Sequence, residues 1–195
     1  MQSYKTYVPE KSITQLQYWI DELAVFIKLT KPRKTKLGDF KIHKGKLVIS
    51  INNNLNSYSF LITLTHELAH AFVYKNHKNT KDPHGKKWQL MFKSMLLNFL
   101  TPDYFPKDIL EVLSLHIRKP NASTLSDIKL SSVLKTYDTY KTIIISDINE
   151  GEEFNLSNGR SFIKGPKLRK RYRCIEKHTK KVYLFHPLAD VSRVQ

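Results

Sequence analysis

The feature that most restricts how this chain can fold is the pentapeptide His66-Glu67-Leu68-Ala69-His70. Two histidines four residues apart lie one turn from each other on the same face of an α-helix, so the motif has a defined geometry only inside a helix. Apolar residues recur around it at helical intervals and form a wide stripe over residues 57–74. A short β-branched run at residues 47–51 precedes this stripe and is typical of a strand. The sequence therefore predicts a strand followed by a helix that carries both histidines.

The spacing of these two histidines suits a divalent metal ion, because both imidazoles can reach one ion from consecutive helical turns. Zinc accepts imidazole nitrogen, and a catalytic zinc takes three protein ligands and leaves one position for water. The metal lowers the pKa of that water to about 7, so a neighbouring carboxylate can remove its proton. The motif thus predicts His66 and His70 as ligands of one catalytic zinc ion (Zn²⁺) and Glu67 as the general base. The competing interpretation is a pair of ordinary helix histidines, which the amphipathic helix and preceding strand disfavour.

The third ligand has to come from another part of the chain, and two histidines are near enough. His77 lies seven residues past His70, about 10 Å further along the axis of a continuous helix, so it can serve only if the helix breaks first. His84 follows thirteen residues of intervening chain, and Asp82-Pro83 before it resembles an N-cap with proline at the first helical position. The spacing favours His84 over His77. More remote candidates are His43, His116, His178 and His186.

Further amphipathic segments predict a mainly helical N-terminal part. Ser12 and Gln15 fit a capping box that opens a helix to about residue 29. The basic stretch at residues 33–46 predicts extended chain and turns. Further helices are predicted at residues 82–99 and 106–117, and a short one at 130–137.

The pattern changes from helical to β after a stretch rich in Pro, Asn, Ser and Thr at residues 120–124. Several short β-type runs follow, and Asn158-Gly159 between two of them is a strong hairpin signal. These runs cover residues 142–145, 153–156, 160–163, 171–175 and 182–185. We therefore expect an α+β fold: a helical core with a short strand region over residues 1–118, a linker or short helix at 119–140, and a small basic all-β module at 141–195.

The chain is strongly basic, with 33 Lys and Arg against 17 Asp and Glu, a net charge of +16 and a pI near 9.8. Residues 160–181 hold ten cations and one anion, and residues 31–46 hold seven cations and one anion. Clustered charge of one sign is typical of a polyanionic partner, usually nucleic acid, whereas the competing interpretation is a solvated charged face. Tyr172 lies among these cations, as aromatic residues do in single-strand binders. The predicted nucleic-acid contacts are Arg160, Lys164, Lys167, Arg169, Lys170, Arg171, Arg173 and Lys177.

The cysteine content and the hydropathy of the sequence indicate the cellular compartment of the protein. Cys174 is the only cysteine, so no internal disulfide can form, and we expect it to be a small buried residue. The apolar runs are far shorter than a membrane span, mean hydropathy is −0.42, and residues 1–10 lack the layout of a secretion signal. We expect a soluble cytoplasmic protein, free or associated with the nucleoid, without a membrane partner.

Two motifs together resemble the SprT-like metallopeptidase family, relatives of the Spartan protease. They are Thr63-Leu-Thr-His-Glu-Leu-Ala-His-Ala71 and Asp82-Pro-His-Gly-Lys-Lys-Trp88. The family shows H-E-x-x-H, then a His-Gly pair and an aromatic residue three positions after the glycine, a place that Trp88 takes here. The resemblance covers roughly residues 10–118. It implies a zincin-like metallopeptidase core in which His66, His70 and His84 bind zinc and Glu67 is catalytic.

The C-terminal module departs from the family pattern. Many SprT-like proteins carry a zinc ribbon there, built on Cys-x-x-Cys pairs, and Cys174 alone cannot build a four-cysteine site. The module therefore has to be held by its own apolar residues or by packing on the helical part. The longer H-E-x-x-H-x-x-G-x-x-H signature also fails, because residue 76 is asparagine.

These observations lead to two functional hypotheses. The first is a zinc-dependent endopeptidase that cleaves proteins bound or crosslinked to DNA, a DNA-repair activity that the resemblance implies; RNA is an alternative polyanion. Its substrate is expected to lie extended along strand 47–51, and Tyr74 is either an oxyanion donor or a helix-surface residue. The second is a non-proteolytic nucleic-acid-binding or regulatory protein with a structural or dormant zinc site. A structural site needs a fourth protein ligand, which the motifs do not offer, and has no need of Glu67.

Overall fold

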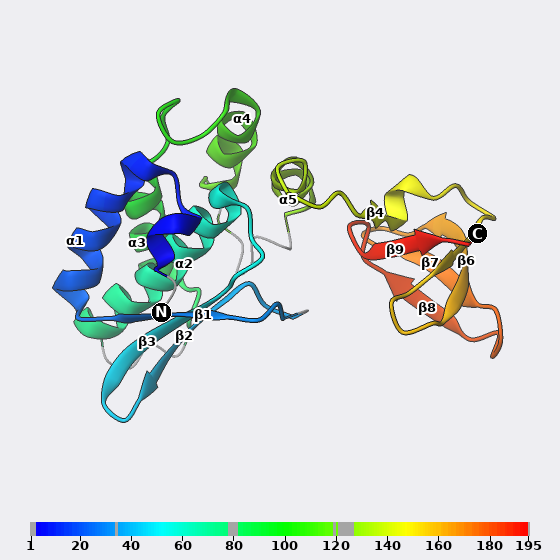
Figure 1. The fold of residues 1–195 in the computed structure, drawn as a ribbon, viewed down its shortest axis with the longest axis horizontal. Helices are drawn as coiled ribbons and strands as arrows, with labels where there is room; N and C mark the ends of the chain where they lie inside the picture. The colour runs from blue at the N-terminus through cyan, green and yellow to red at the C-terminus, as the bar shows by residue number, and fades with distance from the viewer. Residues whose placement is uncertain (1–2, 34, 78–81, 119, 121–126, 195) are drawn as a thin grey trace. The chain divides into compact units, whose positions relative to one another are not determined.

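The computed structural model describes residues 3–33, 35–77, 82–118, 120 and 127–194. The chain divides into two compact units, Met1–Asp138 and Thr139–Gln195, so the division falls inside the segment 119–140. The first unit mixes helices with a small sheet, and strands dominate the second (Figure 1). This arrangement confirms the predicted α+β fold class.

The first unit is built from helices packed on one face of a sheet (Figure 1). Its strands are β1 Phe26–Thr30, β2 Gly38–His43 and β3 Lys46–Asn52, in the order β1-β3-β2. The central strand β3 runs parallel to β1 and antiparallel to β2. The helices are η1 Tyr4–Tyr7, η2 Glu10–Ser12, α1 Ile13–Leu23, α2 Ser57–Asn76, α3 Lys86–Leu97, α4 Lys107–His116 and α5 Ile128–Lys135.

Helix α2 lies at the centre of the first unit and carries the H-E-x-x-H motif. Most of its length is buried, with Phe60, Leu64 and Leu68 fully enclosed, because it packs against the sheet on one side and against α3 on another. The side chain of Asn56 caps its start by accepting a hydrogen bond from the Ser59 backbone at 2.9 Å. A helix enclosed on several sides is a rigid support for the polar side chains that it carries.

The predicted helix over residues 12–29 is wrong in its second half. Helix α1 ends at Leu23, Ala24 adopts a left-handed conformation with φ of 51°, and the chain continues as strand β1. Ile27 misled the prediction, because it fits both the helical spacing after Leu23 and the alternation of a strand. The predicted capping box is also absent, since the Ser12 hydroxyl donates to the Pro9 carbonyl at 2.6 Å instead.

Strand β2 forms within the stretch 33–46, where extended chain and turns were expected. A two-residue turn, Lys44-Gly45 with φ of 49° and 73°, joins it to β3. Because β3 is paired on both sides, it has no free edge, so the expected pairing of a substrate with residues 47–51 is wrong. Among the described strands, β2 forms the edge on this side of the sheet.

Helix α5 lies within the segment 119–140 and belongs to the first unit. Its Leu130 and Leu134 are buried in the first core. Asp127 caps the helix by accepting a hydrogen bond from the Leu130 backbone at 3.1 Å, and its carboxylate also contacts His116 Nδ1 at 2.8 Å. None of the helices in the described part of the chain has the length and apolar character that crossing a membrane requires.

The second unit is an antiparallel sheet in the order β4-β9-β5-β6-β7-β8. The predicted Asn158-Gly159 turn joins β5 to β6, with φ of 81° at Gly159. Phe154, Phe162 and Cys174 are buried in its core, so Cys174 is the small buried residue that the sequence predicts. Its elements are β4 Ile143–Ile144, η4 Ile145–Asp147, β5 Glu153–Asn155, β6 Ser161–Lys167, β7 Tyr172–Glu176, β8 Val182–Phe185 and β9 Asp190–Arg193.

Candidate metal centre

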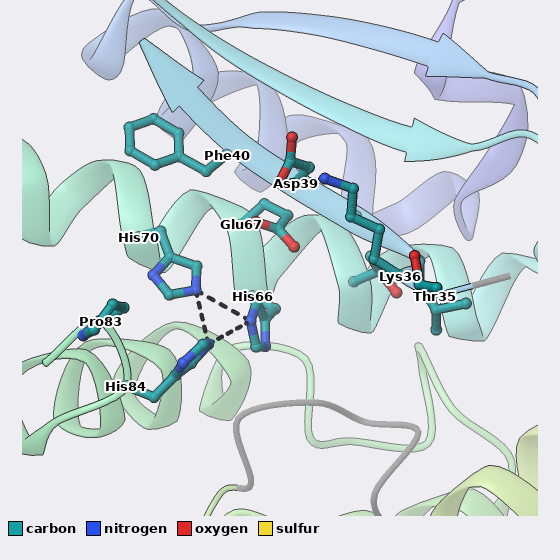
Figure 2. Close-up of a pocket in the computed structure, with 12 residues that line it drawn as sticks. Thr35, Lys36, Asp39, Phe40, His66, Glu67, His70, Pro83 and His84 are labelled. Atoms are coloured by element: carbon teal, nitrogen blue, oxygen red, sulfur yellow. Dashed lines mark hydrogen bonds and ion pairs between the residues drawn. The ribbon is translucent and has the colours of Figure 1, made fainter. Parts of the chain in front are cut away.

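Three imidazoles converge at one point of the first unit (Figure 2). His66 and His70 extend from consecutive turns of α2, and His84 reaches them from the turn before α3. The Nε2 atoms of His66 and His70 are 3.2 Å apart, those of His70 and His84 3.1 Å, and those of His66 and His84 3.4 Å. Three nitrogens on one tetrahedral zinc at about 2.0–2.1 Å are separated by about 3.3–3.4 Å. The triangle therefore has nearly the dimensions of a zinc site.

The donor chemistry of this triangle also fits a cation. Each Nε2 atom carries either a hydrogen or a lone pair, so at least two of three facing nitrogens have the same character and repel each other. A shared cation removes the conflict, because all three lone pairs can then point at it. Among the described residues, His66, His70 and His84 are the group whose ligand atoms lie close enough to hold one metal ion.

Burial keeps the three imidazoles in the uncharged form that coordinates metals. Desolvation, with smaller contributions from the neighbouring histidines, lowers the pKa of His66 to about 2. The same two causes lower the pKa of His70 to about 4. Desolvation also lowers the pKa of His84, against the opposing effect of Asp82. The lone pairs are thus free for a metal ion at neutral pH.

His84 reaches the site by a turn that differs from the predicted helix start. Helix α3 begins at Lys86, with Gly85 as its N-cap residue, so the predicted start at Asp82-Pro83 is wrong. Asp82 instead accepts a hydrogen bond from the His84 backbone at 3.1 Å, and its carbonyl accepts one from Gly85 at 3.2 Å. The Gln89 side chain donates to the His84 carbonyl at 3.0 Å. These bonds hold the backbone of His84 at both its amide nitrogen and its carbonyl oxygen.

Trp88 closes the buried side of the triangle. Its side chain is 1% exposed, and its ring centroid lies 4.5 Å from that of His66, 4.7 Å from that of His84 and 5.3 Å from that of His70. The indole Nε1 also donates to the His66 carbonyl at 3.4 Å. Contact with all three rings restricts their rotation, so Trp88 holds the imidazoles in the geometry that coordination needs.

Glu67 lies beside the triangle and faces strand β2 (Figure 2). It is 6% exposed. Burial and the charge of Asp39 raise its pKa to about 8, while a hydrogen bond from the Phe40 backbone and the charges of Arg33 and Lys36 act in the opposite direction. In the metal-free protein the carboxyl group therefore holds a proton more tightly than an exposed glutamate does, which suits a general base.

Glu67 and the three histidines line one cleft of about 440 Å³. Residues 35–40, here called the cleft wall, form one side, and Pro83 and His84 form the other (Figure 2). The sequence did not assign the cleft wall to the site, although residues 36–51 resemble the strand region that precedes the active helix in the SprT-like family. Gly38 followed by Phe40 and Ile42 at alternating positions offered a further weak strand signal. The cleft therefore places Glu67 and the three imidazoles on one shared cavity.

The other residues considered for the site lie elsewhere. His77 is the C-cap residue of α2 and is outside the triangle, as are the four remote histidines. Tyr74 packs against Phe40, with 6.0 Å between ring centroids, and is not part of the cleft lining.

Three of the eight predicted nucleic-acid contacts have hydrogen-bonding partners inside the second unit, and a fourth, Lys167, has its Nζ 5.8 Å from the Tyr172 ring centroid. Lys164 is buried and donates to the Ile148 carbonyl, with its Nζ 4.1 Å from the Tyr172 ring centroid. Arg160 pairs with Glu176 at 2.6 Å, and Lys177 pairs with Glu153 at 2.8 Å. Lys164 in particular is wrong as a predicted surface contact, because strand β6 turns its side chain inward. Lys167 is nevertheless exposed, as are the other four predicted contacts: Arg169, Lys170, Arg171 and Arg173.

Comparison with known proteins agrees with this geometry. The sequence model of the SprT-like family matches residues 11–106, a range that contains the three histidines, Glu67 and the cleft wall. No curated protein matches the chain significantly. The family match confirms the resemblance carried by the two histidine motifs. The match therefore identifies residues 11–106, most of the first unit, as SprT-like.

Proposed function

We propose that this protein is a zinc-dependent endopeptidase that cleaves proteins bound or crosslinked to DNA. The SprT-like family is associated with metallopeptidase-type hydrolases. The convergence of His66, His70 and His84 beside Glu67, in one cleft, carries the proposal. Three ligands leave a fourth coordination position for water, which is typical of catalytic zinc.

The chemistry divides between the ion and the side chains around it. A bound zinc ion supplies Lewis acidity, which polarises the scissile carbonyl and makes water more acidic. His66, His70 and His84 hold the ion, and Trp88 holds their rings. The Glu67 carboxylate takes a proton from the attacking water and returns it to the nitrogen of the leaving amine.

The edge of β2 is suited to an extended substrate. His43 and Lys46 flank the two-residue turn and form a hydrogen-bonded pair. Along β2, residues whose backbone groups bond to β3 therefore alternate with residues whose backbone groups point away from β3. Gly38, Phe40 and Ile42 occupy the positions whose backbone groups face away from β3. The Phe40 backbone also bonds to Glu67, so Gly38, Ile42 and the remaining group of Phe40 are the ones open to a substrate. A substrate strand can therefore pair with this edge through main-chain bonds, which favours broad sequence specificity.

The central experiment replaces Glu67 by glutamine. The amide keeps the shape of the side chain but cannot accept the proton, so cleavage of a protein attached to a DNA oligonucleotide is expected to fall by about 100-fold or more. Zinc content should match that of the wild type, and the zinc-loaded variant should remain folded. A Glu67→Gln variant that cleaves at the wild-type rate would overturn the proposed mechanism.

We also propose that the partner polyanion is DNA, single-stranded DNA included, and that the protein acts in the cytoplasm. The net charge of +16 and the five exposed cations on and around the β6–β7 turn support a polyanion. The alternative is a non-proteolytic nucleic-acid-binding protein with a dormant site. Assays of protein cleavage with and without single-stranded DNA separate the two, because only the peptidase loses an activity on Glu67→Gln.

A further inference from the structure

Strand β2 lies very close to helix α2 at Gly38. A Cβ atom placed on Gly38 would lie 2.6 Å from Glu67 Oε1, 2.8 Å from Glu67 Cγ and 2.8 Å from Thr63 Cγ2. Such contacts are far inside van der Waals distance. Gly38 lies in an extended strand, outside the left-handed region where glycine is favoured for its backbone. A glycine is required here because there is no room for a side chain.

We propose that Gly38 is a positioning residue for the Glu67 carboxylate, an inference that rests on the proposed function. Without a side chain at residue 38, β2 comes close enough to α2 to enclose the carboxylate between the strand and His66. The backbone of Phe40 is then within hydrogen-bonding reach of Glu67. This bond fixes the carboxylate toward the space beside the three imidazoles.

The start of β2 is tied to β3 and cannot easily move away from α2. The Arg33 guanidinium donates to Asn52 Oδ1 at 2.8 Å, to Ser50 Oγ at 3.0 Å and to the Ser50 carbonyl at 3.1 Å. Asn52 in turn donates from its side chain to the Lys36 carbonyl at 3.0 Å and from its backbone to the Leu37 carbonyl at 2.9 Å. These bonds form the Arg33–Asn52 clamp, which holds the residues just before Gly38.

The consequence is that a side chain at residue 38 displaces Glu67 and leaves the strand in place. Both Glu67 atoms that a new side chain would meet, Cγ and Oε1, move when the rotatable bonds of Glu67 turn, whereas the strand is held by the clamp and by its pairing with β3. Rotation of Glu67 costs little folding free energy but moves the general base out of position. The Thr63 methyl is stiffer and accounts for most of the expected loss in stability.

The test is Gly38→Ala, alone and combined with Thr63→Ser. We expect Gly38→Ala to lower kcat at least tenfold on a DNA-attached protein, with KM and zinc affinity changed less than twofold. Thr63→Ser removes the methyl contact only. The double variant should therefore regain the melting temperature of the wild type while kcat stays low.

Matched variants separate positioning from general damage. Lys41→Ala, an exposed position on the same strand, should keep the wild-type kcat. The inference is overturned if Gly38→Ala has the wild-type kcat, or if Thr63→Ser restores kcat along with stability. An inactive Glu67→Gln beside a fully active Gly38→Ala would reject this inference alone, whereas an active Glu67→Gln would reject the proposed function itself.

Discussion

In the metal-free protein, the histidines and the glutamate of the metal centre make the folding stability depend on pH in opposite directions. The folded-state pKa values of His66, about 2, and His70, about 4, lie below their ordinary value of 6.5. The unfolded chain therefore binds more protons below pH 6.5, and stability falls as the pH decreases from there. Glu67 behaves in the opposite way, because its pKa of about 8 lies above 4.5, so stability falls as the pH rises toward 8.

These linkages predict that the chelator-treated protein is most stable near pH 6.5. Two histidines outweigh one glutamate between pH 4.5 and 6.5, and only the glutamate contributes above 6.5. Urea unfolding at pH 5, 6.5 and 8 measures the profile. In the Glu67→Gln variant, the decrease between pH 6.5 and 8 should disappear. An unchanged decrease in that variant would contradict the assignment to Glu67.

The sequence predicted some residues of the site but not others, for a physical reason. His66, Glu67 and His70 form a local pattern, and the short loop to His84 limits where that residue can lie. Gly38 offered only a weak strand signal and none for a role in the site, because that role arises only where two distant segments meet. Lys164 is a similar case, since a cation in a basic run looks exposed until its strand faces are known.

At the scale of elements, the cleft depends on β2 and on the Arg33–Asn52 clamp behind it. We expect Arg33→Met to destabilise the protein by about 1–3 kcal/mol, because acceptors on Ser50 and Asn52 lose their donor. Loosening the cleft wall should also lower kcat/KM. Urea unfolding and cleavage of a DNA-attached protein measure the two effects.

The clamp prediction has a conservative variant and a control. Arg33→Lys should resemble Arg33→Met, because an ammonium group cannot replace the forked donors of a guanidinium. Lys31→Met changes an exposed neighbouring cation and should leave both quantities unchanged. If Arg33→Met behaves like Lys31→Met, the clamp has no role in holding the cleft wall.

Elements with a strong periodic pattern were predictable, and those set by tertiary pairing were not. Helix α2 covers Ser57–Asn76, close to the predicted 57–74, because its apolar stripe and its cap agree. The end of α1 was missed, since the choice between helix and strand at Ile27 depends on pairing with β3. No pattern indicates β9, because Asp190–Arg193 is polar and mostly exposed.

For the whole molecule, the positive charge is shared between the two units. The first unit carries 21 Lys and Arg against 11 Asp and Glu, and the second carries 12 against 6. The prediction that residues 160–181 are the main binding surface for a polyanion is therefore incomplete. The first unit is longer and has the larger net positive charge. Binding of DNA should be weakened, but not abolished, by changes confined to the second unit.

The triple variant Arg169→Ala, Lys170→Ala and Arg171→Ala tests this expectation. Loss of three phosphate contacts should reduce the slope of log affinity against log salt by about 2 for single-stranded DNA. Fluorescence anisotropy at several salt concentrations measures the slope. The matched control removes three exposed lysines from α3, α4 and α5, namely Lys93, Lys107 and Lys129. Equal slopes for the two triple variants would contradict a specific role for the β6–β7 turn.

The most direct test of the proposed metal centre is X-ray absorption spectroscopy at the zinc edge on the 195-residue chain. We expect one zinc per chain with three imidazole nitrogens at about 2.0–2.1 Å and one water oxygen. His84→Ala should lose one imidazole from this shell, and His77→Ala should not. A fourth protein ligand, or no bound zinc after the protein has been supplied with the metal, would contradict the claim that His66, His70 and His84 form an open catalytic site.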